Sequence, residues 1–200
     1  MSSKCFDFSS KDFLMLTTYN SDELDYITLL SILKDNKLNK KYISRAEQIH
    51  SNKVCYINNP GFYHKADGLI TNIESKLILI IKTADCIPLF IYDNIKGIYG
   101  LVHAGWRGIV DKVHLNATSK FFDLDSDAKN INVIMGPSIK PCCFEVGNDV
   151  TKLFSPNLIS KKDNKFFLDL NESIISDFNK LGISKIKVNK TCTYENKKRH

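Results

Sequence analysis

The chain has 200 residues, of which 43% are hydrophobic and 25% charged, and its formal net charge is +6. These values are ordinary for a globular protein with one proper core, so we expect a single domain over residues 1–200. No apolar run approaches the ~18 residues of a membrane span, and the lysines are spread along the chain apart from its tail, which argues against membrane and nucleic-acid partners.

The N-terminal part of the chain predicts one helix and several short strands. A strand is expected at 13–16. A helix is expected at 21–34, because Ser21 suits an N-cap and the apolar residues after it recur at helical spacing. Two further strands are expected at 53–57 and 69–71, and a turn is expected between them at 58–61.

The rest of the chain is organised around the stretch 77–108, which predicts three successive strands. Its first apolar run, 77–81, is continuous, as in a strand that is buried on both faces. The second run, 87–92, carries Pro88, which favours a strand start or an edge position. After a cluster of turn residues, the third run spans 98–102.

A thiol and an imidazole stand at the ends of these predicted strands. Cys86 precedes the second apolar run, and His103 follows the third, in a glycine-bracketed loop over 103–108. Strand ends that face a loop are where α/β folds commonly place their sites, so this region is the expected location of function.

Helices and strands alternate after that loop. We expect helices at 109–122, at 148–154 and from a cap at Asn171 to Gly182, and strands at 131–135, 166–170 and 185–188. Together the elements predict an α/β (mixed α+β) fold with a central mixed sheet flanked by helices.

Three residues near strand ends form a candidate metal site: His50, Cys86 and His103. Two imidazoles and a thiolate suit zinc, and three protein ligands leave a fourth position open, as in catalytic sites. The spacings match no local zinc-finger pattern. Each residue also has an ordinary structural alternative, a core cysteine or a polar histidine with a satisfied hydrogen bond.

Four neighbours add to this candidate site. Asp85 either orients a ligand or caps a turn, and Gln48 shares a face of an extended segment with the first histidine. Arg107 suits a phosphate or carboxylate, the alternative being a surface ion pair. Trp106 either stacks on a ring or plugs the edge of the core.

The six cysteines include an adjacent pair, Cys142 and Cys143. In a long chain that shows no secretory signal, this pattern favours reduced thiols and a cytoplasmic location. Adjacent side chains of an extended segment point to opposite faces, so we expect neither cysteine of the pair to be a ligand of the candidate site.

Several short motifs occur in an order that resembles the laccase-domain family. They are Gln48-Ile49-His50-Ser51, Ala66-Asp67-Gly68, Thr83-Ala84-Asp85-Cys86-Ile87-Pro88, His103-Ala104-Gly105-Trp106-Arg107-Gly108, Gly136-Pro137-Ser138-Ile139 and Cys192-Thr193. They span a motif-bearing core of about 46–193. Members of this family are named multicopper polyphenol oxidoreductases, zinc-dependent purine nucleoside phosphorylases and adenosine deaminases, and a peptidoglycan editing factor.

The resemblance implies a fold and a set of site residues. The family fold is an α/β/β/α single domain similar to that of toxin deamidases with a Cys–His pair. The family's zinc ligands correspond to His50, Cys86 and His103. Zinc is therefore the expected cofactor, with copper less favoured. Cys86, His103 and Asp85 are the expected catalytic residues, and Glu145 is a second candidate for acid–base work.

The function most favoured is a zinc-dependent enzyme acting on purine nucleosides. It would deaminate adenosine, or cleave adenosine, inosine and methylthioadenosine with phosphate, and Arg107, Trp106 and Gln48 would bind the substrate. One alternative is a Cys–His hydrolase or amidase acting on a peptidoglycan precursor. A copper polyphenol oxidase is another, although five histidines are few for a multicopper cluster.

The chain departs from the family pattern at both ends. An Asn-Arg pair is missing from the stretch 17–36, and the chain stops at 197–200, where the family continues into an arginine-rich tail. These departures motivate a further alternative, a zinc-binding protein without turnover. The expected partners are small molecules, a purine nucleoside and phosphate, and the expected state is a monomer or weak homodimer.

Overall fold

A six-stranded mixed sheet forms the centre of the computed structural model, which describes residues 5–7, 14–18 and 26–197. Its strand order is β14-β10-β8-β9-β6-β4. The inner pairs are antiparallel, whereas the edge strands β14 and β4 run parallel to their neighbours. The strands are β4 (Val54–Tyr56), β6 (Gly68–Asn72), β8 (Ile87–Asp93), β9 (Ile98–Ala104), β10 (Asn132–Met135) and β14 (Lys185–Val188).

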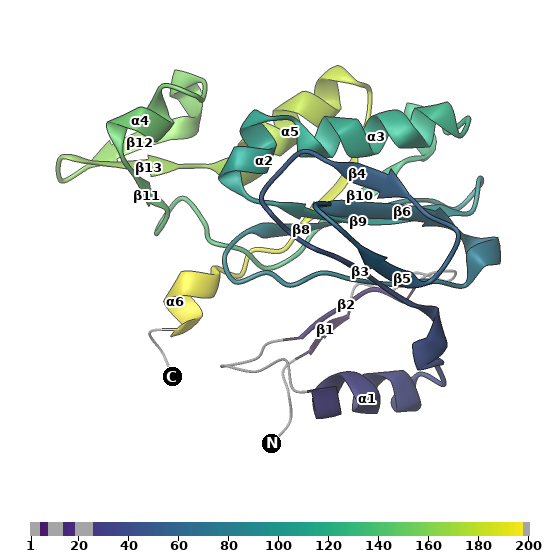
Figure 1. Cartoon of the computed structure of the whole chain (residues 1–200). Coiled ribbons are helices and arrows are strands. Elements are labelled where there is room, and N and C mark those ends of the chain that lie inside the picture. The colour runs from purple at the N-terminus through teal and green to yellow at the C-terminus, as the bar shows by residue number, and fades with distance from the viewer. Residues whose placement is uncertain (1–4, 8–13, 19–25, 198–200) are drawn as a thin grey trace.

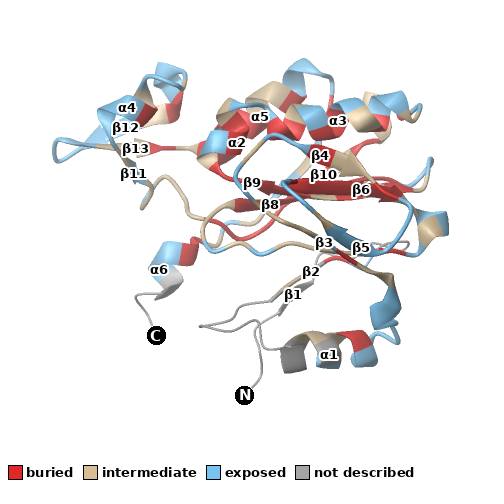
Figure 2. Cartoon of the chain, viewed as in Figure 1, coloured by how far each residue is buried: buried red, intermediate tan, exposed pale blue. Residues whose placement is uncertain are grey.

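Three helices cover one face of this sheet: α2 (Trp106–Val110), α3 (Val113–Asp123) and α5 (Leu170–Lys180) (Figure 1). Buried residues gather in the sheet and on the helix faces turned toward it (Figure 2). In α3 the fully buried Val113, Ala117 and Phe121 are spaced by four residues, so they form one apolar stripe against the sheet.

The opposite face carries smaller elements. A three-stranded parallel sheet has the order β5-β3-β7, and the β1–β2 hairpin and α1 lie beyond the large sheet on the same side (Figure 1). The bounds are β1 (Cys5–Asp7), β2 (Leu16–Thr18), α1 (Tyr26–Asp35), β3 (Ile43–Ala46), β5 (Gly61–Tyr63) and β7 (Ile78–Ile80). The layers thus follow the order helices, large sheet, small sheet and helix α1, which confirms the mixed α/β class.

A small lobe projects beside the helix layer (Figure 1). It contains an antiparallel sheet of order β11-β13-β12 and the short helix α4. The bounds are β11 (Glu145–Val146), α4 (Asn148–Thr151), β12 (Ile159–Lys162) and β13 (Lys165–Leu168). The chain then continues through α5 and β14 to α6 (Thr193–Lys197). In the described part of the chain, no helix combines the length and apolar character that crossing a membrane requires.

The long helix predicted at 109–122 is wrong, because two helices meet at a break. Lys112 has a left-handed backbone with φ of 64°, and it separates α2 from α3. The side-chain amide of Asn52 donates to the carbonyl of Asp111 at 3.0 Å, which satisfies one acceptor that the broken helix leaves open. Apolar spacing continues across the break, so the sequence pattern did not reveal it.

The apolar run 77–81 also behaves differently from its prediction. Its strand, β7, pairs with β3 in the small sheet, and residues 78–80 are half-buried rather than buried on both faces. Leu77 alone is deeply buried, against Ile57 and Leu69 of the large sheet's face. A continuous apolar run in the sequence can therefore also belong to a strand that packs on the core with one face and meets solvent with the other.

Element ends account for most remaining differences. The predicted strand at 13–16 begins instead at Leu16, with Phe13 outside the described residues. The predicted cap Ser21 also lies outside them. Helix α5 is capped by Asp169, which accepts a hydrogen bond from Glu172 N, and not by Asn171. The predicted helix at 148–154 ends early as α4.

Strands β8 and β9 form the ladder that positions the site. Ile87 pairs with Ala104 and Pro88 with His103. Pro88 is the second residue of a strand with neighbours on both sides, so the strand-start prediction is confirmed and the edge position is wrong. His103 lies within β9 rather than after it.

Candidate active site

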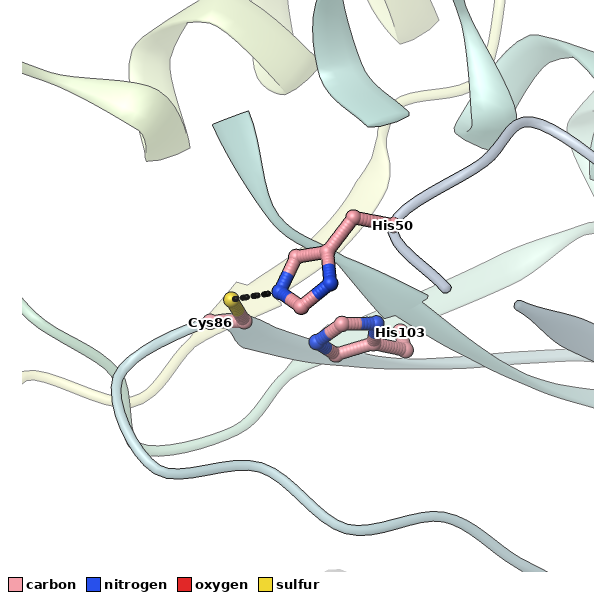
Figure 3. A group of neighbouring side chains, drawn as sticks. All are labelled: His50, Cys86 and His103. Atoms are coloured by element: carbon pink, nitrogen blue, oxygen red, sulfur yellow. Dashed lines mark hydrogen bonds between the residues drawn. The ribbon is translucent and has the colours of Figure 1, made fainter. Parts of the chain in front are cut away.

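The structure brings His50, Cys86 and His103 together from three elements (Figure 3). Their ligand atoms all lie within 4.8 Å of one another. Cys86 Sγ is 3.9 Å from His50 Nε2, and the two imidazole rings meet edge to face with centroids 4.8 Å apart. His50 is exposed, Cys86 half-buried and His103 buried, so the group opens to solvent on its His50 side.

Gly105 makes this approach possible. A Cβ at Gly105 would lie 2.9 Å from Cys86 Sγ and 3.0 Å from His50 Cδ2, closer than side-chain atoms pack. His50 itself has a left-handed backbone with φ of 62°, an uncommon conformation for a residue other than glycine, and local contacts hold it there. Because Gly105 has no side chain, it leaves room for the side chains of Cys86 and His50.

The constraint on the His50 loop is the buried carboxylate of Asp67. It accepts hydrogen bonds from the backbone N–H groups of Ile49, His50 and Ser51 at 3.3, 3.0 and 2.6 Å, and from the Ser51 hydroxyl at 2.7 Å. It also accepts the Nδ1–H of His103 at 2.9 Å. One side chain therefore fixes both histidines. Sequence reasoning gave Asp67 no role, and its only signal was the Ala66-Asp67-Gly68 motif.

These contacts shift two pKa values in opposite directions. Burial raises the pKa of Asp67, but hydrogen bonds from His103 and Ser51 outweigh burial and hold it at about 2. Burial lowers the pKa of His103, but Asp67 and Cys86 outweigh it and raise the value to about 9. Without a metal, the two shifts favour the charged forms of both groups, an imidazolium at His103 and a carboxylate at Asp67.

The donor set fits a metal ion. Because Asp67 holds the proton at Nδ1, the Nε2 atom of His103 is the one that faces Cys86 and His50. A carboxylate behind a ligand histidine fixes its tautomer and orientation in metal sites generally. Two imidazoles, one thiol and an open side match a tetrahedral site with one free position. A metal would displace the proton from Nε2.

Gln48 ties together the two segments that carry His50 and Cys86. Its Nε2 donates to the carbonyl of Lys82 at 2.6 Å, and its Oε1 accepts the N–H of Lys82 at 2.7 Å. Both ends of the amide are thus engaged with the backbone. The substrate-binding role of Gln48 stays a prediction, whereas its positioning role is visible.

Asp85 connects the site to the C-terminal segment. Its carboxylate accepts the hydroxyl of Thr193 at 2.7 Å, and its carbonyl accepts the N–H of Ile139 at 2.9 Å. Its acid–base role stays a prediction. The second candidate for that role, Glu145, lies in β11 of the lobe and forms an ion pair with Lys165 at 2.8 Å.

Arg107 and Trp106 begin helix α2 and do not lie in the loop predicted for them. The guanidinium carbon of Arg107 is 4.3 Å from the ring centroid of Trp106, which packs against the main core. Arg107 is exposed, and none of the salt bridges among the described residues includes it. The surface ion pair considered from the sequence is therefore not seen in the described chain.

A second group of thiols lies apart from these ligands and contains Cys142, Cys143 and Cys192. The prediction that the adjacent pair points to opposite faces is wrong. Residues 141–143 form a turn, and the sulfur atoms of Cys142 and Cys143 are only 3.4 Å apart. Burial and a neighbouring thiol raise the pKa of Cys142 to about 12.

Known proteins match this chain along most of its length. The family model described as multi-copper polyphenol oxidoreductase laccase matches residues 28–200. The chain belongs to this family. Two relatives carry the name purine nucleoside phosphorylase: one from Borreliella burgdorferi, 29% identical over 77% of this chain and 70% of its own, and one from Clostridium acetobutylicum, 31% identical over 78% and 67%.

Solved structures of other proteins share the fold of this chain. YlmD from Geobacillus stearothermophilus matches with a TM-score of 0.78 at 23% identity, over 84% of this chain and 70% of its own. The Neisseria meningitidis protein NMB0706 matches with a TM-score of 0.76 at 20% identity, over 99% and 82%. At such identities the likeness establishes the fold, and the chemistry has to be inferred from the site residues themselves.

Proposed function

We propose that this protein is a zinc-dependent enzyme that acts on purine nucleosides. The proposed reactions are phosphorolysis of adenosine, inosine and methylthioadenosine, and deamination of adenosine. The observation that carries the proposal is the convergence of His50, Cys86 and His103 in front of the buried Asp67 carboxylate. The names of the two relatives support nucleosides as the substrate class.

A zinc ion held by these residues would supply a Lewis acid and a bound water with a pKa of about 7. The chain's part is to prepare the ligands. Asp67 keeps the proton at Nδ1 of His103, so that Nε2 is presented to the ion. The exposed His50 side leaves the open position accessible, and substrate approaches from there.

Arg107 is the proposed phosphate-binding residue. Its guanidinium carbon lies 4.3 Å from the centroid of the Trp106 ring and the group has no salt bridge among the described residues, so its charge and its fork of N–H donors are available to an anion. For deamination, Asp85 is the proposed acid–base group, since it adjoins the ligand Cys86 in sequence.

The test is metal analysis of protein purified without added metal, followed by nucleoside turnover with and without phosphate. We expect stoichiometric zinc and activity in wild type, and loss of both in Cys86→Ala. Cys55→Ala is the matched control, because Cys55 lies on β4 outside both ligand groups. Wild-type protein that carries zinc but turns over no nucleoside would leave only the zinc-binding alternative.

A second candidate function rests on the line formed by Cys86, His103 and Asp67. A thiol, an imidazole and an orienting carboxylate in this order are the parts of a metal-free cysteine hydrolase or amidase. In that case the purified protein should contain no transition metal, and Cys86 should react rapidly with iodoacetamide at neutral pH. Slow alkylation that speeds up only after a chelator removes zinc excludes this candidate.

A further inference from the structure

We propose that Cys142, Cys143 and Cys192 form a second, all-sulfur metal site that binds Cu(I). This site is separate from the group around His50 and does not rest on the proposed nucleoside chemistry. The three sulfur atoms lie within 4.8 Å of one another, and those of Cys142 and Cys143 are 3.4 Å apart. Metal–sulfur bonds of about 2.3 Å would place three ligand sulfurs about 4 Å apart around one ion.

Two segments far apart in the sequence are held together at this point. Ser138 forms a parallel bridge with Cys192, and Thr193 N donates to the carbonyl of Ser138 at 3.2 Å. A tight turn then brings Cys142 and Cys143 back toward Cys192, with Cys143 N and Phe144 N both bonded to the carbonyl of Lys140 at 2.9 Å. The thiols are thus gathered by backbone hydrogen bonds before any ion binds.

The surroundings of Cys192 suit a thiolate. Backbone N–H groups of Lys140, Tyr194 and Glu195 donate to the sulfur of Cys192, which is only 6% exposed. The ammonium of Lys140 is half-buried nearby, held by Ser138 Oγ at 3.0 Å and Asn171 Oδ1 at 3.2 Å. When three thiols bind Cu(I), they release three protons, and the resulting copper–thiolate centre carries two net negative charges. The Lys140 ammonium and the backbone N–H dipoles around Cys192 offset this charge.

The identity of the ion follows from the donors. The group offers three sulfur atoms and, within the part of the chain that is described, no imidazole or carboxylate in the same cluster. Thiolates alone select soft ions such as Cu(I) and Zn²⁺. Cu(I) is satisfied by three sulfurs, whereas structural Zn²⁺ takes four protein ligands. The half-exposed cluster, with Cys142 at the surface, gives the ion a way in.

The experiment uses the full chain carrying Cys86→Ala, which removes the cysteine ligand of the first site. Reduced protein is titrated anaerobically with Cu(I) against a chromophoric chelator. We expect one tightly held Cu(I) per chain, a thiolate-to-copper ultraviolet band and a sulfur-only coordination shell by X-ray absorption. Adding Cys142→Ser or Cys192→Ser should weaken binding by at least about tenfold, whereas the control Cys55→Ser should not.

Cys192 is buried and Cys142 is exposed, so Cys142→Ser should disturb folding less than Cys192→Ser does. Circular dichroism checks that both variants are folded. Undiminished Cu(I) binding in a folded Cys142→Ser protein would overturn the site. So would nitrogen ligands in the absorption spectrum, or a disulfide among these cysteines that survives reductant. Binding of Zn²⁺ in preference to Cu(I) would overturn the choice of ion.

Discussion

The carboxylate of Asp67 accepts hydrogen bonds from the His50 loop and from His103, which lie 17 and 36 residues away in sequence. Its charge is retained because its pKa is held at about 2. Two candidate metal ligands on different elements thus depend on one buried side chain that is not itself a ligand candidate.

Replacing this carboxylate with an amide tests that dependence. Asp67→Asn keeps the shape but loses the charge, so the pKa of His103 should fall toward its ordinary value and zinc affinity should drop about 10- to 100-fold. Competition with a chromophoric chelator measures the affinity. Glu47→Gln is the control, since Glu47 pairs with the exposed His64 at 3.0 Å. A change within twofold in Asp67→Asn would contradict the role.

Arg107→Lys separates anion binding from structure. Lysine keeps the charge but loses the planar fork, so phosphorolysis should weaken mainly through a higher KM for phosphate. Deamination of adenosine needs no phosphate and should suffer less, while zinc content and Tm stay nearly unchanged. Both reactions are assayed in the same variant. Equal losses in the two reactions, or a loss of folding, would assign Arg107 a structural role.

At the scale of elements, the N-cap of α5 shows what a sequence pattern can and cannot locate. Both Asp169 and Asn171 are good capping residues, and the apolar spacing that follows is compatible with either. Tertiary contacts decide: Asn171 Oδ1 accepts from Lys140, which leaves Asp169 to cap Glu172 N. The helix itself was predictable, but its first residue was not.

The cap gives a stability prediction. Asp169→Ala should lower the free energy of unfolding by about 1 kcal/mol, because the N–H of Glu172 loses its acceptor. Urea unfolding followed by circular dichroism measures the change. Asp123→Ala is the matched control, since Asp123 ends α3, where a negative charge opposes the helix dipole, and its removal should not destabilise. Equal losses in both variants would argue against the cap.

At the scale of the whole molecule, the sequence predicted the mixed α/β class and, to within a few residues, all six strands of the central sheet: β4, β6, β8, β9, β10 and β14. Long apolar runs between turn signals carry that information. It could not predict the strand order, or that the strand expected at 77–81 pairs with β3 in the small parallel sheet β5-β3-β7, because such pairing depends on contacts between distant segments and β3 and β5 are only three or four residues long. The same holds for the site: Cys86 directly precedes β8 and His103 lies near the end of β9, so long apolar runs located both residues, whereas Asp67 and the thiol cluster depend on contacts between distant segments.

The shifted pKa values of His103 and Asp67 predict how the stability of the metal-free protein depends on pH. The pKa of His103 rises from 6.5 to about 9 on folding, so its contribution is complete below pH 6.5 and is lost as pH rises through 9. The pKa of Asp67 falls from 3.8 to about 2, so its contribution is complete above pH 3.8 and is lost as pH falls through 2. The pair therefore stabilises the fold most between pH 3.8 and 6.5.

Urea unfolding of metal-free wild type and His103→Gln across pH 5 to 10 measures this effect, since the groups that do not interact with His103 titrate equally in both proteins. The stability advantage of wild type should shrink between pH 6.5 and 9, by on the order of 3 kcal/mol for such a rise in pKa. With zinc bound, the proton at Nε2 of His103 is replaced, so the same interval should be flat and zinc should instead be released on acidification. An advantage that stays constant across that interval in metal-free protein would mean that His103 folds as a neutral imidazole.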